Sequence, residues 1–82
     1  MLKKQPFPIE RIYVPAKRAR TLDPAKVDEI AASILEEGHR TPIQVRADGE
    51  RWVLVEGLHR LEALKALGET VVDGYLVQAR RR

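Results

Sequence analysis

The chain has 82 residues and no cysteine, and 15 lysines and arginines against 12 acids give it a net charge of +3. A domain of this length buries only about 60% of its unfolded surface, which excludes a large enclosed active site and predicts one domain over residues 1–82. Disulfides, thiolate catalysis and cysteine metal sites are excluded as well. The chain has no apolar run of the roughly 18 residues that a membrane span needs and no signal-peptide core near its start. We therefore expect a cytoplasmic protein that does not contact membranes.

The first half of the chain predicts an extended segment followed by a helix. Residues 12–14 (Ile-Tyr-Val) favour extended backbone, and the prolines on either side of them indicate an edge strand. Asp23 can cap a helix, and Pro24 suits the first helical position. Apolar residues recur at helical spacing as far as Gly38, which is placed to end the helix in a left-handed turn. We predict a helix from about Pro24 to Glu37.

The second half predicts a hairpin, a second helix and a last strand. Strands are predicted over residues 42–46, 51–55 and 71–77. Asp48-Gly49 is a hairpin turn signal between the first two, and Gly74 inside the last one predicts a bulge. Gly57 interrupts the second of these strands, and leucines at helical spacing predict a helix over residues 58–67 that ends at Gly68.

The order strand, helix, hairpin, helix, strand predicts an α+β domain with a mixed sheet and two main helices. At Gly57 a strand runs directly into a helix, whose first N–H groups have no partner inside the helix and lie at the positive end of its dipole. Glycine there also lets a ligand approach the backbone. Arg60 supplies a planar fork for phosphate oxygens, and His59 can donate to the same group or move a proton. The turn over residues 56–60 therefore predicts a phosphate site.

Simpler interpretations of the same residues stay open at this point. A glycine between a strand and a helix is often only a turn. Arg60 can pair with Glu56 or Glu62, and His59 can be a surface or capping residue. Trp52 can stack on a nucleic-acid base, although a place in or over the core is the commoner role of such a residue. The two histidines of the chain lack metal-ligand spacing.

Basic residues cluster at positions 3–4, 17–20 and 80–82. Such clusters can attract phosphates, nucleic acid or acidic surfaces. The terminal runs are more simply interpreted as solvated tails, whereas the cluster at 17–20 lies between ordered segments. One tryptophan, one phenylalanine and two tyrosines offer little stacking surface for bases, so nucleic acid is the weaker prediction.

The chain resembles sulfiredoxin in three blocks that agree in order and spacing. Residues 22–27 look like its helix start, and residues 42–45 look like its following strand. Residues 57–63 (Gly-Leu-His-Arg-Leu-Glu-Ala) match its Gly-Cys-His-Arg-Tyr-x-Ala signature, with Leu58 in place of the cysteine. Residues 32–45 are similar to the N-terminal domain of ParB-type partition proteins. The resemblance implies a small ParB/sulfiredoxin-like fold over nearly the whole chain.

The resemblance also implies a set of nucleotide-binding positions. They are Lys26, Glu29, Ser33, Gly57, Leu58, His59 and Arg60. His59 and Arg60 fall where sulfiredoxin contacts the ATP phosphates, and Lys26 falls on a lysine that also reaches the nucleotide. Ser33 falls on a hydroxyl position near the nucleoside. Glu29 falls on a second position, where sulfiredoxin has a serine. Because Gly-Leu-His-Arg is closer to sulfiredoxin than to the arginine-rich partition motif, it favours an adenine nucleotide, ATP or ADP, over CTP.

Leu58 and Glu56 decide which chemistry the resemblance implies. Leu58 has no nucleophile, so sulfinic acid reduction by the sulfiredoxin mechanism is excluded, whereas phosphate binding needs only its backbone N–H. The superfamily also includes small kinases, such as ADP-dependent free serine kinases, with a related acidic-Gly-His-His-Arg turn. Glu56 stands at the acidic position, where it can hold Mg²⁺ or orient an attacking hydroxyl. It can equally pair with Arg60 or cap the helix.

Three functions are compatible with these residues. The first is a Mg²⁺-dependent ATP hydrolase or phosphotransferase, with Glu56, His59 and Arg60 as catalytic residues and a small molecule or a protein as phosphate acceptor. The second is a nucleotide-binding regulatory module without turnover. The third is a ParB-like nucleic-acid-binding or nuclease domain that uses the basic clusters. We expect the first, because phosphoryl transfer needs little beyond positioning and electrostatics.

Overall fold

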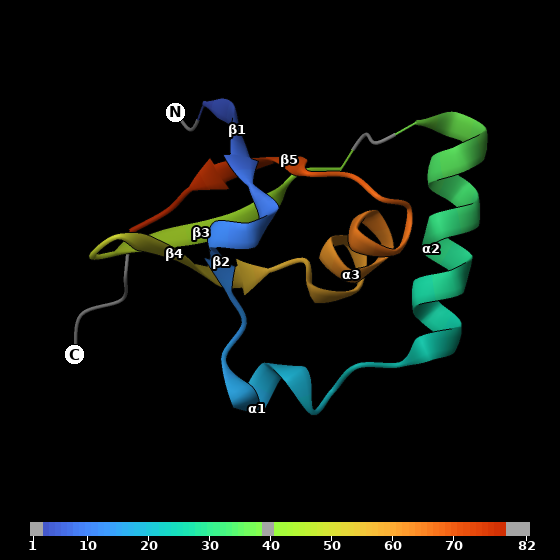
Figure 1. The fold of residues 1–82 in the computed structure, drawn as a ribbon, viewed down its shortest axis with the longest axis horizontal. Coiled ribbons are helices and arrows are strands. Elements are labelled where there is room, and N and C mark those ends of the chain that lie inside the picture. Colours follow the sequence, from blue (N-terminus) through green and yellow to red (C-terminus); the bar gives the residue numbers. More distant parts are fainter. Residues whose placement is uncertain (1–2, 39–40, 79–82) are drawn as a thin grey trace.

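Five strands form one mixed sheet, and three helices accompany it, as the computed structural model shows for residues 3–38 and 41–78 (Figure 1). The strands are β1 (Lys4–Pro8), β2 (Ile12–Tyr13), β3 (Ile43–Asp48), β4 (Arg51–Glu56) and β5 (Val71–Leu76). The helices are α1 (Ala16–Ala19), α2 (Pro24–Glu37) and α3 (Leu58–Ala66), with a short 3₁₀ turn, η1 (Ile9–Arg11), between the first two strands. The predicted α+β class is confirmed.

The strand order is β1-β5-β3-β4-β2. The two outer pairs differ, since β1 runs antiparallel to β5 and β2 runs parallel to β4. In the centre, β3 is parallel to β5 and antiparallel to β4. The predicted edge position of residues 12–14 is therefore confirmed for β2. The other edge is β1, where Pro6 and Pro8 lack the N–H groups that a further strand would need.

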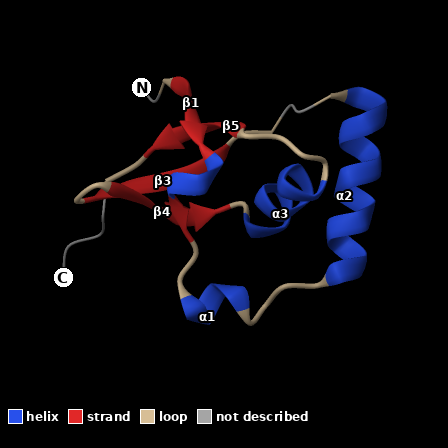
Figure 2. Cartoon of the chain, in the orientation of Figure 1, coloured by secondary structure: helices blue, strands red, loops and turns tan. Residues whose placement is uncertain are grey.

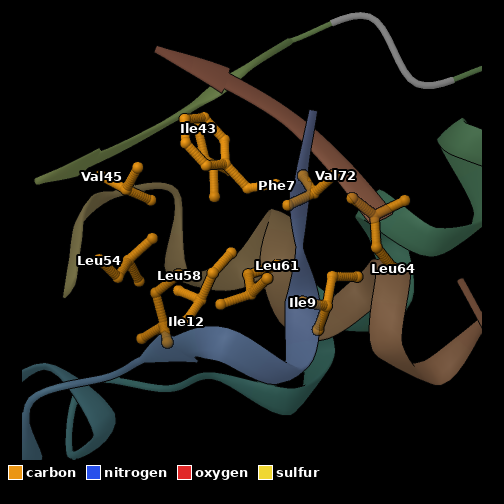
Figure 3. Packing of buried hydrophobic residues seen from close by; sticks show 10 residues of the cluster. All are labelled: Phe7, Ile9, Ile12, Ile43, Val45, Leu54, Leu58, Leu61, Leu64 and Val72. Carbon is orange, nitrogen blue, oxygen red and sulfur yellow. The ribbon is translucent and has the colours of Figure 1, made fainter. Parts of the chain in front are cut away.

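The two long helices cover the sheet in successive layers (Figures 1 and 2). Helix α3 lies against the sheet and α2 packs on α3. Buried residues from the strands, η1 and α3 meet in one cluster (Figure 3): Phe7, Ile9, Ile12, Ile43, Val45, Leu54, Leu58, Leu61, Leu64 and Val72. Trp52 packs half-buried against this cluster, with its ring edge-on to Phe7 at 5.1 Å between centroids. The prediction that Trp52 belongs to the core or covers it is confirmed.

Helix α2 has the predicted bounds because its end signals are local. The Asp23 side chain accepts a hydrogen bond from the Ala25 N–H at 3.1 Å, Pro24 stands at the first helical position, and Gly38 ends the helix with φ of 86°. None of the described residues of α2 is fully buried. This helix is thus an outer layer, and no helix of residues 3–38 and 41–78 is long and apolar enough to cross a membrane.

Three features differ from the sequence-based predictions. Strand β1 and the short helix α1 were not predicted. The bulge predicted at Gly74 is wrong, because the pairing of β5 with both neighbours continues unshifted through this residue. The register shift lies instead between Gln44 and Val45. Gly74 is needed for close packing, since a Cβ atom there would lie 3.0 Å from both Cγ1 and the carbonyl oxygen of Ile43.

Candidate functional site

The junction between β4 and α3 has the predicted strand–glycine–helix geometry. Strand β4 ends at Glu56, Gly57 adopts φ of 108°, and α3 begins at Leu58. The first backbone bond of the helix is donated by the Leu61 N–H to the Gly57 oxygen at 2.9 Å. The N–H groups of residues 58–60 therefore have no partner inside the helix. No side chain caps this end in the described part of the chain.

Gly57 has a packing reason as well as a conformational one. A Cβ atom at this position would lie 2.6 Å from Cγ2 of Ile43, which is itself fully buried. Real Cβ atoms essentially never approach so closely, and φ of 108° is unfavourable for any side chain. The interpretation of Gly57 as a structural turn accounts for the glycine itself. It does not account for His59 and Arg60, which follow the glycine.

A groove of about 420 Å³ lies against the start of α3. Its lining comes from α1, α2 and the β4–α3 junction and consists of Arg18, Thr21, Lys26, Glu29, Ile30, Glu56, Gly57, Leu58, His59 and Arg60. Every predicted site residue is in this lining except Ser33, which is exposed on α2 one helical turn beyond Glu29. Arg18 and Thr21 were not predicted. The basic cluster at 17–20 was the available signal for Arg18.

Arg60 has no carboxylate partner among the described residues. The simpler interpretation was that it pairs with Glu56 or Glu62, and this is wrong. Glu56 instead lies 3.7 Å from Arg18, and Glu62 lies 3.3 Å from Lys65. Arg60 is half-buried as a residue, and it stands in the first turn of a helix that no described side chain caps, with its guanidinium donors available for an anion.

His59 connects the starts of the two long helices. Its Nε2 atom accepts a hydrogen bond from the backbone N–H of Asp23, at 3.0 Å. Asp23 is the residue that caps α2, so this bond ties the beginning of α3 to the beginning of α2. Since Nε2 acts as an acceptor here, only Nδ1 of the ring can donate to a ligand.

Two carboxylates, Glu29 and Glu56, lie in the lining of the groove. Within residues 3–38 and 41–78 no three groups of the kinds that bind metals come together. Mg²⁺ commonly uses one or two carboxylates and takes its other ligands from substrate phosphates and water. The residues present therefore fit a Mg²⁺ ion that arrives with a phosphate ligand, and they do not form a complete protein site for the metal.

A larger hollow of about 580 Å³ lies beside β2 and the β3–β4 hairpin. Its arginines are already engaged. Arg51 pairs with Asp48 at 3.1 Å and stacks 4.0 Å over the Tyr13 ring, and Arg11 donates to the Glu50 carbonyl at 3.0 Å. The smaller groove at α3 is therefore the better anion site, because its cations and backbone donors are less occupied.

A mixed sheet with a glycine turn that opens a helix onto a basic groove defines the class of ParB/sulfiredoxin-like domains. The chain belongs to the ParB N-terminal domain family, whose model matches residues 4–82. Sulfiredoxin from Arabidopsis thaliana is similar in structure, with a TM-score of 0.82 and 30% identity over 94% of this chain and 86% of that one. No curated protein matches this sequence.

Two similar structures are nucleotide complexes of longer proteins. ParB from Caulobacter crescentus with CTP-gamma-S has a TM-score of 0.76 and 24% identity over 98% of this chain and 46% of that one. A free serine kinase with ADP has a TM-score of 0.79 and 16% identity over 90% of this chain and 30% of that one. These two likenesses establish the fold. The present chain spans less than half of either protein.

Proposed function

We propose that this chain binds an adenine nucleotide by its phosphates at the start of α3. The observation that carries the proposal concerns residues 3–38 and 41–78: among them no side chain caps the N-terminus of α3, and no carboxylate pairs with Arg60 in its first turn. A cation at a helix N-terminus opposes the dipole unless an anion lies beside it. A phosphate at this point would satisfy both the backbone donors and the guanidinium.

Each wall of the groove has a part in this binding mode. The N–H groups of residues 58–60 would donate to one phosphate, and Arg60 would bind its oxygens with two parallel hydrogen bonds. Lys26 on α2, which also lines the groove, would add a point charge. Nδ1 of His59 would donate while Nε2 keeps its bond to the Asp23 N–H.

The choice of an adenine base rests on similarity. The Gly57–Arg60 sequence resembles sulfiredoxin, and the free serine kinases of similar fold bind AMP and ADP. ParB, which shares the family of this chain, binds a CTP analogue. CTP is therefore the competitor against which an adenine preference has to be measured. Ser33 and Glu29 on α2 are the residues that we assign to the nucleoside.

We further propose that the site is a Mg²⁺-dependent ATP hydrolase or phosphotransferase. Glu56 directly precedes Gly57 and has an exposed carboxylate, which supports a role in holding the metal. When bound, Mg²⁺ would neutralise phosphate charge. Arg60 would stabilise the negative charge of the transferring group, and His59 would donate a hydrogen bond from Nδ1 to the same group. A small molecule or a protein would supply the acceptor hydroxyl.

Binding without turnover is the second candidate, and two contacts favour it. Glu56 is paired with Arg18, and Nε2 of His59 is occupied by a backbone N–H. The two residues that would contact metal or phosphate are therefore engaged in holding neighbouring elements. A regulatory module would use the groove in this state.

One titration separates these candidates. The ¹⁵N-labelled chain is titrated with Mg²⁺-ATP, Mg²⁺-ADP and Mg²⁺-CTP while inorganic phosphate is followed in the same sample. Saturable amide shifts at residues 57–60 and near Lys26, with phosphate release, support the hydrolase. The same shifts without release support the binding module or a kinase that lacks its acceptor. Absence of shifts at residues 57–60 contradicts nucleotide binding at this site.

A further inference from the structure

Helix α1 is the least anchored element beside the groove. It has four residues, none of them buried, and it joins β2 to α2 along one side of the molecule (Figure 1). Its backbone is held mainly by its own turn, since Thr21 donates to the Arg18 carbonyl through both its N–H, at 2.9 Å, and its hydroxyl, at 2.8 Å. The Arg18 side chain therefore projects from a short helical turn that is stabilised mainly by its own hydrogen bonds.

The Arg18 side chain connects α1 to the turn that contains Gly57. Its Nη2 atom lies 3.7 Å from Oε2 of Glu56, the residue that immediately precedes Gly57. Both residues line the groove at the start of α3. The side chains are 39% and 65% exposed, respectively. An ion pair this long and this exposed contributes little free energy, so breaking it costs little.

An anion at the start of α3 would compete with Glu56 for the Arg18 guanidinium. A phosphate carries more negative charge than one carboxylate and offers the guanidinium two oxygens at a better geometry. The phosphate would also repel the neighbouring Glu56 carboxylate. Both effects favour Arg18 on the phosphate over Arg18 on Glu56.

We infer that Arg18 is a further phosphate-binding residue, which exchanges Glu56 for the nucleotide phosphate and draws α1 across the groove. The exchange releases the Glu56 carboxylate at the moment when the phosphate arrives. This inference rests on the proposed function, and it adds to it a cation from outside the glycine turn. Movement of the Arg18 side chain would therefore couple phosphate binding to the position of α1.

The test is ADP binding in Mg²⁺-free buffer, which keeps any metal role of Glu56 out of the measurement. Affinities are measured by calorimetry for the wild type, Arg18→Ala, Glu56→Gln and the double variant. Lys17→Ala is the matched control, because Lys17 is an exposed cation on the same helix that does not line the groove. The ¹⁵N spectrum of each variant reports whether the fold is kept.

Three results are expected if the exchange occurs. Arg18→Ala weakens ADP binding about tenfold, as the loss of a charge-assisted hydrogen bond predicts, and Lys17→Ala weakens it less than about twofold. Glu56→Gln tightens binding, and the gain is about twofold larger in the wild-type background than in Arg18→Ala, because only there does Glu56 compete for the guanidinium. The Arg18 Nε–H signal shifts with the same saturation as the amides of residues 57–60.

The alternatives give different results. Equal effects of Arg18→Ala and Lys17→Ala, equal gains from Glu56→Gln in both backgrounds, or an unmoved Arg18 Nε–H signal would each overturn the exchange. In those cases the shifts at residues 57–60 would still support nucleotide binding. If ADP produces no shift at residues 57–60, the proposed function itself fails, and the exchange fails with it.

Discussion

The N-termini of α2 and α3 lie close to each other and are built in opposite ways. At α2, the Asp23 carboxylate accepts from the Ala25 N–H and Pro24 removes a further donor. At α3, Gly57 offers no side chain, and the first turn carries His59 and Arg60 without any acid. The described part of the chain therefore satisfies the start of α2 by itself and leaves the donors at the start of α3 without a side-chain cap.

This difference indicates what each helix start contributes. A capped start stabilises the fold with no ligand present. An open start with a cation, Arg60, in its first turn loses a little stability in the free protein and recovers it when an anion binds. We therefore expect substitution of the capping residue Asp23 to change mainly stability, and substitution of Arg60 in the first turn of α3 to change mainly binding.

The largest expected effect is at Gly57, where packing and function meet. Gly57→Ala places a Cβ atom 2.6 Å from Ile43 Cγ2 and holds alanine at φ of 108°. We expect a loss of about 3 kcal/mol in the free energy of unfolding, from overpacking together with backbone strain. Urea denaturation measures it.

Gly68→Ala is the matched control for this prediction. Gly68 lies just beyond the other end of α3 at φ of 82°, with nothing within 4 Å of an added Cβ atom. Only the strain of positive φ applies there, so we expect a loss of about 1 kcal/mol. Equal losses for the two variants would mean that the contact with Ile43 relaxes without cost.

The second effect in size concerns Arg60. Arg60→Ala removes a guanidinium that has no carboxylate partner in the described part of the chain, so the fold should keep its stability. ADP binding should weaken about 30-fold, and any release of phosphate from ATP should disappear with it, because charge-assisted bonds to phosphate are lost. Calorimetry and phosphate release check the two parts.

Lys65→Ala is the corresponding control at the far end of the same helix, where Lys65 pairs with Glu62. We expect less than about a twofold change in ADP affinity, since salt screens a cation that distant from the phosphate. If both variants weaken binding equally, the contribution of Arg60 is a general charge effect and the phosphate does not lie at the start of α3.

The parts that the sequence predicts well depend on neighbours in the chain. Helix α2 was predicted at its observed bounds because Asp23, Pro24 and Gly38 are all local signals. The junction at Gly57 was predicted because a glycine between a strand and a helix is also a local signal. The phosphate site at this junction stays a prediction. No such signal marks β1, whose partner residues lie far along the chain, as in the pairing of Phe7 with Val72.

The features that the sequence did not predict, the position of Arg18 and the packing of Gly74, also depend on residues that are distant in the chain. Arg18 reaches the groove because α1 turns the chain between β2 and α2, and a four-residue helix has no recognisable periodicity. The bulge predicted at Gly74 is wrong because a glycine in a strand is compatible with either a bulge or a close approach of the backbone. Only the position of Ile43, between Gly57 and Gly74, decides between the two.

A smaller effect is expected at the closed helix start. Asp23→Ala removes the cap of α2 and should lower the free energy of unfolding by about 1 kcal/mol, the usual value for such a cap. ADP affinity should stay within about twofold, since the Asp23 backbone N–H still reaches His59. Asp28→Ala, further along α2, is the control that keeps the change in charge and leaves the cap intact. A loss of ADP affinity as large as that of Arg60→Ala would contradict the division of roles between the two helices.

The smallest stability effect is expected at the bond that joins the two helix starts. His59→Ala removes the acceptor of the Asp23 N–H, and because Asp23 is exposed, water can replace the ring nitrogen. We expect a loss of about 0.5 kcal/mol in stability. In the ¹⁵N spectrum the Asp23 amide should move while the Ala25 amide, which is held by the cap, stays in place.

The ADP affinity of the same variant tests whether His59 also contacts the phosphate. If Nδ1 of His59 donates to phosphate, as we propose, His59→Ala should weaken ADP binding about fivefold, the effect of one neutral hydrogen bond. His59→Asn, whose shorter side chain offers both a donor and an acceptor, should restore only one of the two contacts. If His59→Ala loses stability and keeps its ADP affinity, His59 has only a structural role, which is to hold the starts of the two helices together. The phosphate would then be left to the backbone, Arg60 and Lys26.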